Sequence, residues 1–264
     1  MNILEQLAEH AKTRVEDKKQ IKSLEQIKAE AYELPKGDFS FEKALRKPGI
    51  SFICECKKAS PSKGIIAEEF DYIESAKSYE AAGADCISVL TEPKWFLGSD
   101  EYLKEIVNTV SIPVIRKDFT VDEYMIYEAK LLGASAVLLI CSILTESQIR
   151  EYICICDSLG LSALVEAHDE KEVEIAAKAG ARLIGVNNRN LKDFSVDTEN
   201  SKRLRTLVDD NVIFVSESGI KTSEDIASLR SAGVDAVLIG ETLMKAADKK
   251  EKLRELRGDK DDNN

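Results

Sequence analysis

From residue 50 onward, short apolar runs alternate with amphipathic stretches along the chain. Apolar runs of this length are typical of buried strands, and the stretches between them repeat their apolar positions with the period of a helix. Helices are predicted, for example, over 72–82 and 123–132. The runs that predict eight strands are 52–56, 86–90, 114–117, 136–140, 163–166, 183–186, 212–215 and 236–239.

A recurring Gly-containing turn precedes four of these strands. The glycines are Gly83, Gly133, Gly180 and Gly233, at intervals of 50, 47 and 53 residues. Each lies where a helix gives way to a strand, which suits a left-handed residue after a helix C-terminus. Eight strands alternating with helices, two strand–helix units per interval, predict a (βα)8 barrel. A doubly wound open sheet is the alternative, but no Gly-x-Gly-x-x-Gly follows the first strand.

Residues 1–48 show a helical period and no strand pattern. Their two apolar stripes are Ile3, Leu4, Leu7, Ala8, Ala11 and Val15, and then Ile21, Leu24, Ile27, Ala31 and Leu34. Pro35 and Gly37 end the second stripe. We expect 1–48 to be a helical extension of one barrel domain that spans 1–264. The polar segment 257–264 is predicted to be a disordered tail.

Composition narrows the classes of partner. The net charge of −11 argues against a nucleic-acid partner, whose phosphates require a basic surface. Glu5 and Glu9 interrupt the N-terminal apolar pattern, and the longest apolar run, 136–144, is too short to span a bilayer. A cytoplasmic protein without a membrane partner is therefore predicted.

The six cysteines do not show the spacing of a zinc site, and only His10 and His168 are available as further ligands. In a long chain without a secretion signal, reduced thiols are the default. We expect no metal site and predict that the cysteines are small buried apolar side chains.

The end of the first strand combines an apolar face with a charged one. Because side chains alternate along a strand, Phe52, Cys54 and Cys56 share one face, whereas Glu55 and Lys57 lie on the other. Buried charges are costly unless they are paired or used. Glu55 and Lys57 are therefore predicted to point into an active site that the following loop covers.

Several other predicted strands also end in polar groups, and in a barrel all these ends meet at the catalytic face. The candidates are Lys117, Glu166, Asn187, Arg189, Glu217, Ser218, Gly219, Gly240 and Glu241. Barrel phosphate sites often use the loops after the seventh and eighth strands, where Gly lets the backbone approach an anion. Ser218-Gly219 and Gly240-Glu241 occupy those places.

The charges at this face suggest the ligand. Lys57, Lys117 and Arg189 can neutralise a multiply anionic small molecule, while neighbouring glutamates keep the lysines protonated and oriented. A flat ring would suit the apolar residues of the same rim, which are Trp95, Phe96, Phe119, Leu138, Ile140 and Leu191. For His168, hydrogen bonding or positioning of the next helix is favoured over a role as base.

Taken together, these segments resemble the indole-3-glycerol phosphate synthase family of tryptophan biosynthesis over almost the whole chain. Glu55-Cys-Lys-Lys-Ala-Ser-Pro-Ser-Lys-Gly64 and Gly185-Val-Asn-Asn-Arg-Asn-Leu191 are its most specific motifs. The resemblance also covers 90–92, 116–119, 165–166, 216–220 and 239–244, of which the last two occur in other phosphate-binding barrels.

The resemblance implies a lyase without a cofactor. Its substrate would be 1-(2-carboxyphenylamino)-1-deoxyribulose 5-phosphate, which undergoes ring closure, decarboxylation and dehydration. The implied catalytic residues are Glu55, Lys57, Lys117, Glu166, Asn187 and Ser218. The implied substrate contacts are Ser60, Ser62, Phe96, Phe119, Leu138, Ile140, Arg189, Leu191 and Glu217, and the implied phosphate contacts are Ser218, Gly219, Gly240 and Glu241.

Within that set, Lys117 is the preferred acid for ring closure, although the choice between Lys57 and Lys117 stays open. Lys57 would pair with the ring carboxylate, and Glu166 would move a proton during dehydration. Association with other tryptophan-pathway enzymes is a further hypothesis.

Two other functions are considered for the chain. One is phosphoribosylanthranilate isomerase, which would need a thiol base that the outward-facing cysteines do not provide. The other is a non-catalytic barrel that senses a phosphorylated metabolite.

Overall fold

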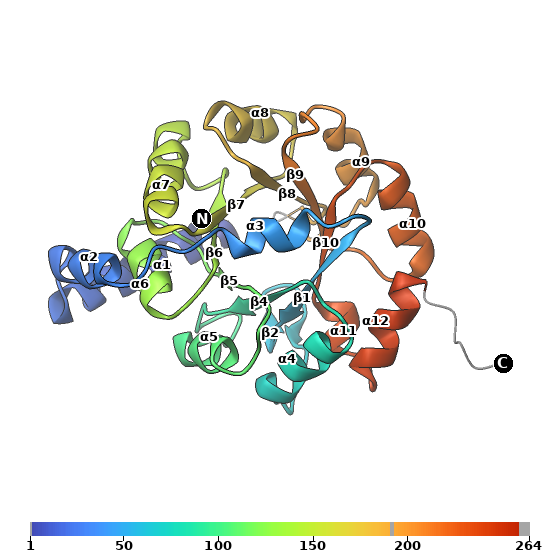
Figure 1. The fold of residues 1–264 in the computed structure, drawn as a ribbon, viewed down its shortest axis with the longest axis horizontal. Helices are drawn as coiled ribbons and strands as arrows, with labels where there is room; N and C mark the ends of the chain where they lie inside the picture. The colour runs from blue at the N-terminus through green and yellow to red at the C-terminus, as the bar shows by residue number, and fades with distance from the viewer. Residues whose placement is uncertain (1, 191–192, 259–264) are drawn as a thin grey trace.

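The computed structural model describes residues 2–190 and 193–258. At its centre, eight parallel strands form a closed barrel in which each strand pairs with its neighbours in chain order (Figure 1). Pairing of Ser51 with Ala236 joins the first strand to the last and closes the ring. The barrel strands are β1 (Ser51–Cys56), β4 (Cys86–Leu90), β5 (Val114–Lys117), β6 (Ala136–Ile140), β7 (Ser162–Ala167), β8 (Leu183–Asn187), β9 (Ile213–Glu217) and β10 (Ala236–Ile239). The predicted (βα)8 barrel is confirmed.

Helices surround the barrel on the outside (Figure 1). They are α4 (Tyr72–Ala81), α5 (Asp100–Val107), α6 (Tyr124–Leu131), α7 (Glu146–Leu159), α8 (Glu170–Lys178), α9 (Glu199–Arg205), α10 (Ser223–Ser231), α11 (Glu241–Met244) and α12 (Lys249–Arg257). The four glycines of the recurring turn all have a positive φ, between 78° and 88°. They end α4, α6, α8 and α10 as the sequence predicts, because L-residues avoid this backbone region.

Two short strands interrupt the segment after β1. β2 (Ala59–Ser60) and β3 (Gly64–Ile65) pair antiparallel and form a small hairpin within the predicted covering loop. The sequence did not predict this hairpin, because two-residue strands show no alternation of apolar and polar positions.

The N-terminal extension consists of α1 (Ile3–Ile21), α2 (Leu24–Glu33) and α3 (Ser40–Leu45). α3 lies across one end of the barrel (Figure 1), where the Leu45 carbonyl accepts a hydrogen bond from Ser51 at the start of β1. α1 instead contacts the segments that follow β4 and β5, so it lies at the opposite, C-terminal end of the strands. The second predicted stripe is only partly correct, because Ile21 is 88% exposed and Leu34 is also exposed.

The core has two layers, one inside the barrel and one between the barrel and its helices. Ile53 packs in the inner layer, whereas Phe52, Cys54 and Cys56 pack in the outer one, as the alternation along β1 predicts. The prediction of buried cysteines is wrong for Cys154, which is exposed, while Cys156 is buried. Both lie on α7, and residues two apart on a helix point in very different directions.

The predicted tail begins too early. Arg257 is the last residue of α12, and its guanidinium donates a hydrogen bond to the Gly83 carbonyl. The same guanidinium lies 4.8 Å from the centre of the Phe52 ring, so it packs on an outward-facing side chain near the start of β1. Residues 259–264, for which disorder was also predicted, lie outside the described part of the chain.

Candidate active site

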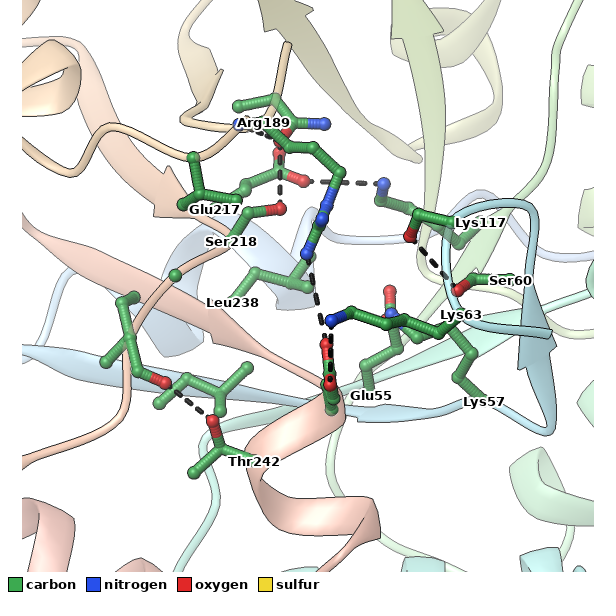
Figure 2. A pocket seen from close by; sticks show the side chains of 18 of the residues that line it. Glu55, Lys57, Ser60, Lys63, Lys117, Arg189, Glu217, Ser218, Leu238 and Thr242 are labelled. Carbon is green, nitrogen blue, oxygen red and sulfur yellow. Dashed lines mark hydrogen bonds and ion pairs between the residues drawn. The ribbon is translucent and has the colours of Figure 1, made fainter. Parts of the chain in front are cut away.

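The C-terminal ends of the barrel strands open into a cavity of about 790 Å³ (Figure 2). The site residues predicted from the sequence line it, with two exceptions: Trp95, and Leu191, which lies outside the described residues. These lining residues are Glu55, Lys57, Ser60, Ser62, Phe96, Lys117, Phe119, Leu138, Ile140, Glu166, Asn187, Arg189, Glu217, Ser218, Gly219, Gly240 and Glu241. They come together because parallel strands of one barrel all end at the same face.

Two lysines and three glutamates form a buried charge cluster at the floor of the cavity. The ammonium of Lys117, at the end of β5, lies 3.2 Å from Glu166 Oε2 and 3.3 Å from Glu217 Oε2. The ammonium of Lys57 lies 2.5 Å from Glu55 Oε1. Among the described residues, three carboxylates therefore face two ammonium groups, and Glu166 and Glu217 share that of Lys117.

The pKa values of the cluster follow from burial and from these neighbouring charges. Burial raises the pKa of Glu217 to about 7; Lys117 opposes this rise, while Glu166 and Glu55 add to it. Burial also disfavours the anions of Glu55 and Glu166, but their nearby lysines outweigh it and hold both pKa values below the ordinary range. The same carboxylates overcome burial at Lys117 and raise its pKa. At neutral pH, Glu217 is thus the member of the cluster that titrates.

Asn187, at the end of β8, connects the cluster with the loop after β9. Its Oδ1 accepts hydrogen bonds from the Ser218 hydroxyl at 2.9 Å and from the Arg189 N–H at 3.0 Å. Its Nδ2 donates to Glu166 Oε1 at 3.4 Å. Ser218 and Gly219 both have a positive φ, so the chain turns sharply directly after the strand.

Two glycines make room for the carboxylates. A Cβ on Gly185 of β8 would lie 2.2 Å from Glu217 Oε1, and a Cβ on Gly240 would lie 2.4 Å from Glu55 Oε1. A Cβ on Gly240 would also lie 3.0 Å from the Lys57 ammonium. Gly240 was predicted as a phosphate contact, whereas the requirement for glycine at 185 was not foreseen.

A second set of charges lies at the rim. Glu241, the first residue of α11, accepts a hydrogen bond from Lys245 at 2.7 Å. Lys63 of the β2–β3 hairpin and Arg189 each lie 3.9 Å from its carboxylate (Figure 2). Lys63 and Lys245 line the cavity but were not among the predicted site residues, although Lys63 belongs to the motif that opens the covering loop.

An apolar wall faces these charges. The rings of Phe96 and Phe119 lie 6.0 Å apart, and Leu138 and Ile140 of β6 complete the wall. Trp95 does not line the cavity, contrary to expectation. Its ring packs edge-on against His10 of α1, with the ring centres 5.3 Å apart.

The helix α1 holds this wall through two buried carboxylates. His10 Nδ1 lies 3.1 Å from Glu92 Oε1, and Glu92 accepts the backbone N–H groups of residues 94–96. Arg14 donates to both oxygens of Asp118, at 3.0 and 2.7 Å, directly beside Lys117 and Phe119. The extension thus supports the cavity wall through His10 and Arg14, which no local sequence pattern marks as site residues.

Among the described residues, no group of three or more His, Cys, Asp or Glu side chains is placed to hold a metal ion. Within the same residues, no helix has both the length and the apolar composition needed to cross a membrane.

Comparison with known proteins shows which family this chain belongs to. A family model described as indole-3-glycerol phosphate synthase matches residues 4–256. The chain belongs to the indole-3-glycerol phosphate synthase family. Enzymes of that name from Ruminiclostridium cellulolyticum and Lachnoclostridium phytofermentans are 59% and 53% identical to it. Each alignment covers 97% of this chain, with 99% of the first relative and 98% of the second.

Solved structures of more distant barrels share the fold alone. A 3-hexulose-6-phosphate synthase matches with a TM-score of 0.62 and 17% identity over 79% of this chain and 99% of its own. The thiamine phosphate pyrophosphorylase of Pyrococcus furiosus matches with a TM-score of 0.59 and 18% identity over 79% of this chain and 94% of its own.

As a member of the indole-3-glycerol phosphate synthase family, the chain is a lyase of tryptophan biosynthesis, EC 4.1.1.48. It converts 1-(2-carboxyphenylamino)-1-deoxyribulose 5-phosphate into indole-3-glycerol phosphate, CO2 and water. The isomerase and the metabolite sensor considered from the sequence are therefore wrong.

Proposed function

We propose that Lys117 is the general acid of ring closure and that Lys57 binds the carboxylate of the substrate ring. The observation that supports this division is the pairing of Lys117 with two buried carboxylates, Glu166 and Glu217, which keep its ammonium charged. Lys57 is paired with Glu55, and its side chain is more exposed, at 18% against 13% for Lys117. It is thus the cation more open to an incoming anion.

The reaction then needs three proton transfers. The aryl carbon attacks the ketone carbon, and Lys117 protonates the oxygen as the new carbon–carbon bond forms. The ring carboxylate leaves as CO2. Glu166 removes a proton from the carbon chain, and the hydroxyl departs as water with a proton from Lys57. Two protons are given and one is recovered, so each turnover takes up one proton from solvent.

The remaining lining residues bind the substrate. The backbone N–H groups of Ser218, Gly219, Gly240 and Glu241, with the Arg189 guanidinium, would hold the phosphate, since they belong to the loops after β8, β9 and β10. Glu55, Asn187 and Glu217 would accept or orient the substrate hydroxyls. Ser60 and Ser62 of the β2–β3 hairpin would close over the ligand, a lid role that stays a prediction. Phe96, Phe119, Leu138, Ile140 and Leu191 would pack on the aromatic ring.

Two variants test the assigned roles. Lys117→Ala should abolish ring closure while substrate still binds, because a positioned acid contributes ~10²–10⁴-fold. Turnover is followed by indole fluorescence, and binding by equilibrium titration. Glu166→Gln should lower kcat more than it changes KM. Near-normal turnover of the Lys117 variant, or a pure rise in KM for the Glu166 variant, would contradict the respective role.

We also propose that the enzyme works in the cytoplasm and associates with other enzymes of the tryptophan pathway. The first proposal is supported by its six cysteines, all of which are free thiols, as in a reducing compartment. Cell fractionation and affinity capture of the tagged enzyme test the two proposals. Recovery of the enzyme outside the cytoplasm would contradict the first, and capture without a pathway enzyme would contradict the second.

A further inference from the structure

Among the described residues, one buried ring nitrogen beside the charge cluster has no hydrogen-bond partner. His168 lies two residues after Glu166, and its Nε2 is 3.5 Å from Glu166 Oε1, beyond a good hydrogen bond. The other nitrogen, Nδ1, lies 3.0 Å from Glu172 Oε2 on α8. Buried polar atoms without a partner are rare in folded proteins, so this one calls for a reason.

Glu166 and His168 line different cavities. Glu166 lines the reaction cavity, whereas His168 and Glu172 line a second cavity of about 620 Å³. Ser142, on the same side, donates a hydrogen bond to Glu172 Oε1 at 2.5 Å. Glu172, the counter-charge of the imidazole, therefore lines the second cavity and not the reaction cavity.

The groups around the ring favour its charged form. Burial lowers the pKa of His168, but Glu172 and Glu166, with Glu217 farther away, outweigh burial and raise it. Ser142 approaches Nδ1 at 3.4 Å, and Asn200 of α9 donates to the His168 carbonyl. The charged side chains of Glu5, Asp169 and Arg189 line the same cavity as the ring. As an imidazolium, the ring carries an N–H on both nitrogens, so Nε2 directs a proton at Glu166.

This arrangement meets a requirement of the reaction, because each turnover takes up one proton while substrate fills the cavity above Glu166. We propose that His168 stores this proton and gives it to Glu166 during the reaction. The proposal rests on the role of Glu166 set out under Proposed function. His168 acts through Glu166 and does not touch the substrate, so it is a positioning residue that also supplies a proton.

The step balances in atoms and charge. The Nε2–H bond of the imidazolium breaks and an O–H bond forms on Glu166 Oε1, which leaves a neutral imidazole and a carboxylic acid. Glu166 passes the proton to the amine that Lys117 has become after ring closure. Nδ1 keeps its hydrogen, held by Glu172, so Nε2 is the nitrogen that regains a proton from water after the product leaves.

The test compares His168→Gln and Glu172→Gln with the parent enzyme across pH. Gln at position 168 can place an N–H near Glu166 but cannot give up a proton in this range. We expect its kcat near pH 7 to fall at least about 10-fold, short of the ~10²–10⁴-fold that a directly acting acid contributes. KM should change little. The decline of kcat at alkaline pH that reports loss of the imidazolium should disappear in this variant.

Glu172→Gln keeps the imidazole but removes its counter-charge. The alkaline decline should therefore move to lower pH, while kcat at acidic pH stays close to that of the parent. The pKa of Glu217 is also raised, so the same profile is recorded for Glu217→Gln, in which the decline due to His168 should persist. A purely structural role for His168 would lower kcat equally at every pH and leave the shape of the profile unchanged, which would overturn the proposal.

A wild-type kcat and pH profile in His168→Gln would also overturn it. If that variant does not fold, an unshifted profile in Glu172→Gln overturns it instead. Glu166→Gln separates this inference from the role on which it rests. Substantial turnover of the Glu166 variant would contradict the proposed role of Glu166, whereas an inactive Glu166 variant beside an unchanged His168 variant would refute only the proton supply.

Discussion

The sharing of one ammonium by Glu166 and Glu217 leads to a prediction about how the stability of the fold depends on pH. Glu217 is buried and shares the Lys117 ammonium with Glu166, and its Oε1 has no hydrogen-bond partner in the part of the chain that the structure describes. Its pKa is raised to about 7 in the folded chain from an ordinary value of 4.5. Between these two pH values the folded chain binds more protons at this site than the unfolded chain does. The contribution of Glu217 to stability therefore falls as the pH rises through this window.

The magnitude follows from the two pKa values. One pH unit corresponds to about 1.36 kcal/mol, so ionising Glu217 in the folded chain costs about 3 kcal/mol above pH 7. A glutamine has nearly the shape of the protonated acid and cannot ionise. Glu217→Gln should therefore raise the free energy of unfolding by about 1–3 kcal/mol at pH 8, after allowance for the contact that Lys117 loses. Near pH 4 the gain should vanish.

Urea unfolding at pH 4 and pH 8 measures this difference, and Glu166→Gln is the matched control. The pKa of Glu166 lies below its ordinary value, because Lys117 and His168 outweigh its burial. Glu166 thus stabilises the fold above its unfolded pKa and loses that contribution as the pH falls through its folded pKa. The control should be destabilised at pH 8, opposite in sign to Glu217→Gln. A Glu217 variant no more stable than the parent at pH 8, or a gain independent of pH, would refute the reasoning.

Three further changes probe other parts of the structure. Gly240→Ala should lower kcat by about 10²-fold, because the added Cβ would displace Glu55 or Lys57 and a shift of a catalytic group by an ångström lowers the rate by about this factor. Unchanged steady-state kinetics would contradict this prediction. Arg14→Met should lower the free energy of unfolding measured in urea by about 3–5 kcal/mol, because it leaves Asp118 buried without its cation. Adding Asp118→Asn to this variant should recover part of the loss. Lys12→Met, at an exposed position of the same helix, serves as the control. Cys154→Ser should change the free energy of unfolding by less than about 0.5 kcal/mol, whereas Cys156→Ser should lower it by about 1–3 kcal/mol, because only Cys156 is buried. Equal effects of the two substitutions on thermal unfolding would contradict this prediction.

The strands were predictable because they combine two strong signals. Each barrel strand is a buried apolar run, and before five of them a left-handed glycine ends the preceding helix: the four glycines of the recurring turn, and Gly160 after α7. The same logic fails where local pattern is weak or misleading. The two-residue strands β2 and β3 have no period to detect, and Cys154-x-Cys156 has the spacing of a strand face although it lies on a helix.

The residues of the site were predictable for a geometric reason, since strand ends of one barrel must converge. It could not be predicted which carboxylates would share one ammonium, because that depends on distances between side chains of β5, β7 and β9. The need for glycine at 185 depends in the same way on where Glu217 of another strand points. The contacts of α1 with Glu92 and Asp118 join segments far apart in sequence, and no local pattern marks them.

Those contacts of α1 have a consequence for the order in which the nascent chain can assemble. Arg14 and its partner Asp118 are separated by 104 residues. At ~5–20 residues per second, the ribosome adds Asp118 roughly 5–20 s after Arg14. Until then the apolar stripe of α1, with Leu4 and Leu7, has no barrel to cover. The helix that is synthesised first is therefore among the last to find its place, and it spends that interval as an exposed amphipathic segment.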